Sequence, residues 1–203
     1  MRRLFIVALG SALFLSACGT SAASPNAGSS TPTEVASAAG SQPTTEASTN
    51  AIPGWITFAP DGKGFSAIYP GNPTLQTQTI QTASGPVPMS VWYYEASDDL
   101  SYYVALGTYP QGSLSSGPLS DVYDAAVTDM SNMSLGMTIS GQGDVTISGH
   151  AGRAFTVANS AVTVKGELIA VGDNLYKVYV LYPSAASESP NVAVFLSGFK
   201  LTV

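Results

Sequence analysis

The sequence predicts an α+β fold in which a mainly antiparallel β-sheet packs against about two α-helices. Apolar and polar residues alternate over most of the chain after residue 52, as in strands with one buried face. Glycine-containing turns separate these stretches, and two stretches with helical spacing interrupt them. All ten tyrosines and both tryptophans follow residue 52, so residues 53–203 are expected to form one globular domain.

The first half of this domain predicts two hairpins and a further strand. The turn Asp61-Gly62-Lys63-Gly64 joins the first pair of strands, and Gly85-Pro86 separates the second pair. The fifth strand ends at Pro110, before a loop rich in Gly and Ser. The predicted strands are residues 55–58, 65–69, 75–82, 87–95 and 102–109.

The hydrophobic period then changes to that of a helix over residues 119–135. Val122, Ala126, Met130 and Met133 recur at spacings of four and three, which predicts one buried helix face. Core packing explains the two methionines better than a metal site or a pliable binding surface. Ser120 is the expected N-cap, with Asp121 and Asp124 in the first turn, where the helix dipole favours acidic side chains.

The second half predicts four more strands and a second helix. The strands are residues 137–147, 154–158, 162–171 and 175–182, and the last two flank the turn Gly172-Asp173-Asn174. In the strand at 162–171, Thr163, Lys165 and Glu167 share one face, which is expected to be wet, while the apolar residues share the other. Ser189-Pro190 predicts the N-cap and first residue of the closing helix.

The start of the chain has the pattern of a secretory signal peptide over residues 1–17. Arg2 and Arg3 precede an apolar run that is too short for a bilayer span of about 20 residues. Leu15-Ser16-Ala17-Cys18 resembles the lipobox of bacterial lipoproteins, and this resemblance implies that Cys18 is acylated and becomes the mature N-terminus. The alternatives for this lone cysteine are an unmodified residue near an ordinary cleavage site and a buried core residue.

Residues 18–52 predict a disordered tether for the domain. Ala, Ser and Thr dominate this segment and no aromatic residue occurs in it, so it buries too little apolar area to offset the entropy of ordering. As a flexible coil it would reach roughly 30 Å, enough to clear the lipid headgroups. A tether threaded into peptidoglycan or glycosylated on its Ser and Thr residues is an open alternative.

The charge balance limits the class of partner. Without residues 1–17 the chain keeps five Lys and Arg against 13 Asp and Glu, a net charge of −8. Nucleic-acid binding needs clustered basic residues, so it is not expected, and the body of the domain should not adhere to anionic lipid. Membrane attachment would come from the acyl chains, which places the domain outside the cytoplasm at the cell membrane or the outer membrane.

Several residue groups together are similar to the PsbP/DcrB-like superfamily. They are Gly64-Phe65-Ser66-Ala67-Ile68-Tyr69-Pro70, Gly149-His150-Ala151-Gly152-Arg153, Asn174-Leu175-Tyr176-Lys177-Val178 and Phe195-Leu196-Ser197-Gly198-Phe199-Lys200-Leu201. The resemblance implies an antiparallel sheet with packed helices, and proteins that act mainly by binding other proteins. Gly198 departs from the pattern, because Ser or another polar residue is expected there.

The sequence shows no catalytic constellation and implies no cofactor. His150 is the single histidine, no G-x-S-x-G elbow accompanies it, and one His cannot provide a zinc site. His150 is therefore expected in a turn, hydrogen-bonded to backbone. Asp98-Asp99 and Asp173-Asn174 lack the ligand series of a calcium loop and are expected in turns. A noncatalytic binding or assembly module is the main hypothesis, with an envelope hydrolase or an apolar-ligand carrier as alternatives.

An aromatic surface is the candidate for partner binding. Trp92 and Tyr94 share one face of the strand at 87–95, and Tyr102 follows beyond the next turn. If exposed, these three side chains would provide a patch for an envelope protein, a peptide or a glycan. The favoured interpretation, however, is that a helix covers these side chains.

Overall fold

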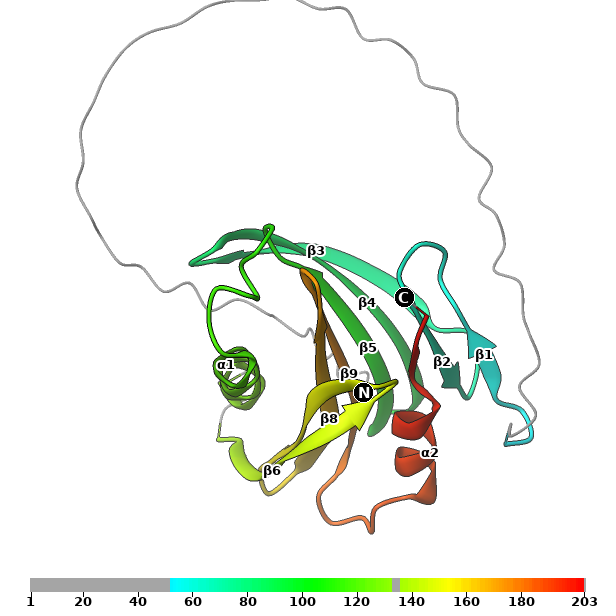
Figure 1. Ribbon diagram of the computed structural model, residues 1–203. Coiled ribbons are helices and arrows are strands. Elements are labelled where there is room, and N and C mark those ends of the chain that lie inside the picture. The colour runs from blue at the N-terminus through cyan, green and yellow to red at the C-terminus, as the bar shows by residue number, and fades with distance from the viewer. Residues whose placement is uncertain (1–51, 133–135, 203) are drawn as a thin grey trace, which may run out of the picture. The chain divides into compact units, whose positions relative to one another are not determined.

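The computed structural model describes residues 52–132 and 136–202. Along this part of the chain the elements are β1 (Ile56–Phe58), β2 (Phe65–Tyr69), β3 (Thr74–Thr82), β4 (Gly85–Ser97), β5 (Leu100–Thr108), α1 (Leu119–Asn132), β6 (Thr138–Ile147), β7 (His150–Ala158), β8 (Val162–Val171), β9 (Asn174–Pro183), α2 (Pro190–Gly198) and β10 (Lys200–Leu201). The predicted α+β class is confirmed (Figure 1).

Seven strands form one antiparallel sheet in the order β3-β4-β5-β9-β8-β7-β6. Two meanders build it: β3 to β5 on one side and β6 to β9 on the other. The chain passes between them through α1, so that β9 pairs with β5. Because neighbouring strands are antiparallel, alternate residues along each strand face the two sides of the sheet. The strands β3 and β6 are its edges.

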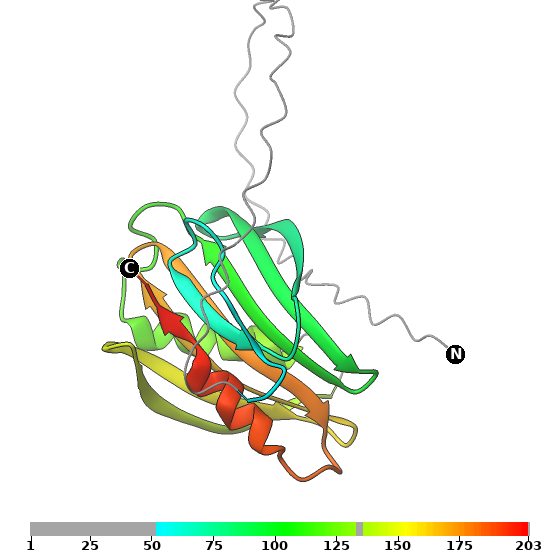
Figure 2. The ribbon, with the colours of Figure 1, turned by 90° about the vertical axis from the view of Figure 1, so that its right-hand side faces the viewer.

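The two faces of this sheet are covered by different elements. Figure 1 shows α1 beside one face and α2 with β1 and β2 beside the other, and Figure 2 views the second face directly. On the α1 side, Tyr123, Val127 and Met130 pack with Phe155, Leu168 and other strand residues. On the α2 side, side chains of the small sheet and of α2 form the larger cluster. Both faces therefore contribute a hydrophobic core.

A second, three-stranded sheet in the order β1-β2-β10 lies over the large one. The predicted hairpin of β1 and β2 is confirmed, with Ile56 opposite Tyr69. The buried Tyr69 hydroxyl donates to the Trp92 carbonyl in β4 over 3.1 Å, which ties the two sheets together. Such a bond matters because a buried polar group without a partner is costly.

The first helix differs in two details from its prediction. It begins at Leu119 after Pro118, so Ser120 lies inside the first turn, and its hydroxyl is 3.3 Å from an Asp121 carboxylate oxygen. Proline suits a helix start because its fixed φ is helical and it lacks an N–H. The buried face is Tyr123, Ala126, Val127 and Met130, with Val122 at its margin, while Met133 lies outside the described residues.

The second helix begins as predicted. Ser189 is the N-cap, its hydroxyl accepts from the Asn191 amide, and Pro190 is the first helical residue. At the other end the departure at Gly198 has a physical reason. A Cβ at this position would collide with the Ile68 side chain of β2. Glycine therefore permits the close approach of α2 to the small sheet, and serine would not fit there.

The strand β7 begins at His150, four residues before its predicted start. Ser148 and Gly149 form a two-residue turn with φ of 50° and 83°, and Ile147 pairs with His150. Both positions of this kind of hairpin turn require positive φ, which glycine adopts freely. The glycines and small residues of 149–153 indicated a longer turn, whereas they belong to a regular hairpin. His150 itself pairs within the sheet.

Candidate functional site

The structure does not form the exposed aromatic patch considered at Trp92, Tyr94 and Tyr102. Trp92 is 3% exposed and Tyr102 is 1% exposed, and Tyr94 is partly buried against the same core. Phe65 packs edge-on against Trp92 at a centroid distance of 5.1 Å, and Phe195 of α2 lies 5.1 Å from Tyr102. These side chains are therefore core residues.

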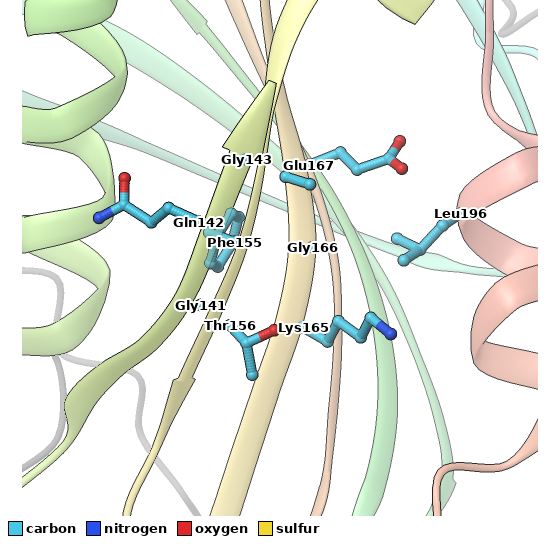
Figure 3. A pocket seen from close by; sticks show the side chains of 10 residues that line it. Gly141, Gln142, Gly143, Phe155, Thr156, Lys165, Gly166, Glu167 and Leu196 are labelled. Atoms are coloured by element: carbon cyan, nitrogen blue, oxygen red, sulfur yellow. The ribbon is translucent and has the colours of Figure 1, made fainter. Parts of the chain in front are cut away.

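The face of the large sheet that α2 covers has a shallow groove near the β6 edge. The groove lies between β6, β7 and β8 on one side and α2 on the other, and has a volume of about 200 Å³ (Figure 3). It is open to solvent. Its lining residues are Gly141, Gln142, Gly143, Ala154, Phe155, Thr156, Lys165, Gly166, Glu167 and Leu196.

Small residues account for the groove. Two cross-strand rows have their side chains on this face: Gly141 with Thr156 and Lys165, and Gly143 with Ala154 and Glu167. A Cβ added to Gly143 would meet no atom within 4 Å, so its missing side chain leaves open space. The edge of the sheet therefore contributes almost no bulk, and Figure 3 shows Lys165, Glu167 and Leu196 on the side toward α2.

Lys165, which lines the groove, forms an ion pair with a residue outside the lining. Lys165 Nζ lies 2.8 Å from both carboxylate oxygens of Glu188, which is in the loop before α2. Both side chains keep more than a third of their surface in water, at 37% and 39%. An exposed pair of this kind contributes little to stability, but it fixes the direction of the Lys165 ammonium.

Glu167 is the acidic residue among those that line the groove, and it forms no ion pair with a described residue. Burial raises the pKa of its carboxyl, while Lys165 and Lys200 at longer range lower the pKa. Burial has the larger effect because it removes water from the ionised form. The groove thus holds a carboxylate that would gain from a cation brought by a partner.

The alternation in the sequence predicts a wet strand face for Lys165 and Glu167 but does not indicate that they form a site. That face is only half-exposed, and Ile169 on it is fully buried in the core beneath α2. Glu188 and Leu196 are far from Lys165 in the sequence. The signal that could have indicated a site is a strand with alternating charged side chains that lies in the same cross-strand rows as small residues of β7 and glycines of β6, but it requires the pairing register.

A second hollow lies between the β5–α1 loop and the β8–β9 turn. Its volume is about 360 Å³, and its lining residues are Leu114, Ser115, Gly117, Leu119, Ala170 and Gly172. It contains no ionisable side chain among these residues. The hydroxyl of Ser115 donates to the Gly112 carbonyl, so it serves the loop itself. The groove beside α2 offers more chemistry for recognition.

Within residues 52–132 and 136–202, no group of three or more His, Cys, Asp or Glu side chains is placed to hold a metal ion. In the same ranges, neither helix combines the length and apolar character of a membrane span. Cys18, the predicted signal peptide at 1–17 and nearly all of the predicted tether at 18–52 lie outside the described residues.

Comparisons with known proteins support the fold. The sequence matches no family model and no curated protein. The structure is similar to the solution structure of cyanobacterial PsbP (CyanoP) from Synechocystis sp. PCC 6803, with a TM-score of 0.52 and 12% identity over 77% of this chain and 97% of that chain. The fold is therefore PsbP-like. A protein of unknown function from Pseudomonas aeruginosa, PA94, aligns over 57% of this chain and 85% of that chain with 12% identity and a TM-score of 0.37.

Proposed function

We propose that the protein is a membrane-anchored, noncatalytic binding module of the cell envelope. Cys18 carries the lipid, residues 18–52 form the tether, and the groove beside α2 receives a basic side chain from an extended segment of a partner protein. The environment of Glu167 is the main reason to propose a cationic ligand. Its carboxyl is half-buried in an open groove, and no described residue pairs with it.

The charges around the groove support a cationic ligand. Glu188 holds Lys165 in a bidentate pair, so the lysine is directed to that loop. The mature chain, with five basic and 13 acidic residues, would attract a basic segment and repel an acidic one. A partner ammonium or guanidinium beside Glu167 would replace some of the water that the carboxyl loses on burial.

A short peptide tests the ligand class directly. The full chain in detergent micelles would be titrated with capped Gly-Lys-Gly, and the backbone resonances followed by NMR. We expect shifts confined to Gly141, Gly143, Glu167 and their neighbours. Capped Gly-norleucine-Gly is the control, because it keeps the alkyl chain and lacks the charge. Equal shifts with both peptides would exclude recognition of a cation.

We further propose that the protein is not an envelope hydrolase. His150 is the single histidine of the chain and lies at the start of β7, where it is partly buried and pairs with Ile147. No described residue donates to or accepts from its ring in a hydrogen bond, so it lacks the partners of a general base. Broad esterase, peptidase and glycosidase assays of the purified chain should show no turnover. Turnover lost on His150→Ala would contradict this part.

The anchor rests on the lipobox alone. Mass spectrometry of the intact protein from the membrane fraction should find a chain that begins at Cys18 and carries acyl mass. Two or more acyl chains are expected, because a single chain binds membranes only marginally. A secreted form with a free thiol would contradict the anchor, and it would leave the proposal about the groove standing.

A further inference from the structure

The two edges of the large sheet differ in how they are protected against pairing. β6 has a bulge between Ile139 and Gly141, a second glycine at 143 and a charged side chain at Asp144. Bulges, glycines and charges are common devices that prevent an exposed edge from pairing with another strand. β6 thus has the features of a protected edge.

The strand β3 has none of these devices. Its sequence is TLQTQTIQT, without a charged residue, proline or glycine, and its nine residues pair with β4 without a break. Most of its side chains are exposed, and Leu75 has 53% of its surface in water. No described strand pairs with its outer edge. A long, regular, neutral edge is a template for another strand.

We propose that β3 pairs with β3 of a second copy of this chain, antiparallel across a two-fold axis at Gln78. This register pairs Thr74 with Thr82 and so uses all nine residues. The residue numbers of each pair add up to 156, so both members are even or both odd. Every second residue of an edge strand points its N–H and C=O groups away from the sheet. Because paired residues are both even or both odd, these free groups of one strand face the free groups of the other, as an antiparallel ladder requires.

The side chains fit this register. Thr77 lies opposite Thr79, so two hydroxyl groups meet. Gln76 lies opposite Ile80, so the aliphatic part of the glutamine side chain can pack against the isoleucine. Leu75 lies opposite Gln81, whose methylene groups would cover part of the exposed leucine. No like charges face each other, because the strand has none. The strand is thus complementary to itself.

The acidic parts of the two copies would stay apart. Asp98 and Asp99 lie in the β4–β5 turn, beyond the end of β3 that carries Thr74, since Thr74 pairs with Tyr93. Antiparallel pairing places the two turns at opposite ends of the joined strands. A nine-residue strand is roughly 30 Å long, nearly four Debye lengths of about 8 Å at physiological salt. Repulsion between these turns is then screened, so it does not oppose the pairing of two copies through their self-complementary strands.

Disulfide trapping in the native membrane tests the register. Gln78 is the residue on the axis, so Gln78→Cys should give the highest yield of covalent dimer among single cysteines placed along β3. The yield should fall on both sides of this position. Thr146→Cys on β6 is the matched control and should give no dimer. The unaltered chain controls for disulfides through Cys18.

Introducing a complementary pair of charges tests whether β3 pairs with β3 of a second copy or with a different protein. Thr77→Lys in the Gln78→Cys background should reduce the dimer about tenfold, because the altered pair occurs twice in each dimer. Adding Thr79→Glu should restore the dimer, since the new glutamate of one copy faces the new lysine of the other. A chain that gives no dimer at any β3 position, or a disulfide from β3 to a different protein, would overturn the proposal.

Discussion

The ammonium of Lys165 lies 2.8 Å from each carboxylate oxygen of Glu188, and this pair joins β8 to the loop before α2. Glu167 lies two residues along the same strand and on the same face. While Glu188 holds the lysine, the carboxyl of Glu167 is free to meet a cation from a partner. In the proposed function, the ion pair therefore holds Lys165 toward Glu188 and leaves Glu167 to the ligand.

Glu188→Gln should weaken partner binding, because it would release Lys165 to pair with Glu167. Stability should change by less than about 1 kcal/mol, since the pair is exposed. The double variant Glu188→Gln with Lys165→Met should recover binding, because it removes the competing ammonium. Titration with the lysine peptide would measure both. Equal weakening in the single and double variants would assign Glu188 to direct ligand contact instead.

Glu167→Gln should stabilise the unliganded protein at neutral pH while it weakens binding. Burial raises the pKa of this carboxyl, so the folded chain binds its proton more tightly than the unfolded chain. Ionised Glu167 thus destabilises the fold above its raised pKa. The gain in Tm should shrink as pH falls through that pKa and vanish below the ordinary carboxyl pKa. Thermal unfolding from pH 3 to 8 measures it, and a lower Tm at neutral pH would be a contrary result.

Lys177→Met should stabilise the protein at neutral pH. Lys177 in β9 is 8% exposed, and burial lowers its pKa, while Asp129 of α1 opposes this shift. Because the unfolded chain binds the proton more tightly, stability rises with pH from the lowered pKa to the ordinary lysine pKa. The gain of the variant should therefore be largest below that window and disappear above it. Denaturant unfolding at several pH values tests this expectation.

Gly198→Ala should destabilise the fold by about 1–3 kcal/mol, the usual cost of overpacking. The added methyl group would collide with Ile68, where α2 meets the small sheet. Ile68→Ala in the same chain should cancel part of the loss, since it removes the colliding carbons. Gly117→Ala is the control, because a Cβ there meets nothing. Additive losses in the double variant would contradict this contact.

Trp92→Ala should cost about 3–5 kcal/mol, as expected for a large core side chain. Tyr69→Phe should cost about 0.5–1.5 kcal/mol, because it removes the buried hydrogen bond from the Tyr69 hydroxyl to the Trp92 carbonyl. Chemical denaturation provides both numbers. A loss below 1 kcal/mol for Trp92→Ala would indicate a surface residue.

The class and order of the elements could be predicted because each depends on neighbours in the sequence. Ser189 and Pro190 start α2 through local capping, and the period-two pattern of 162–171 needs only one buried face. The burial of Trp92 could not be predicted in the same way. It depends on Phe58 and Phe65 in a second sheet whose placement follows from long-range packing.

The groove could not be predicted for a related reason. Gly143 and Glu167 meet only through the register of β6, β7 and β8, and Leu196 arrives with a helix from the end of the chain. A strand pattern specifies which residues share a face, but it does not specify what the next strands place beside them. Gly198 shows the same limit, since its partner Ile68 is 130 residues away.

In-cell photo-crosslinking at Thr156 on the groove floor tests the central claim most directly. Benzoylphenylalanine at this position should give one discrete adduct with an envelope protein, and Glu167→Gln should abolish the adduct while the chain stays folded. The same probe at exposed Thr128 of α1 is the control and should not give that adduct. An adduct at Thr156 that persists in Glu167→Gln, or that also forms at Thr128, would contradict recognition through the groove.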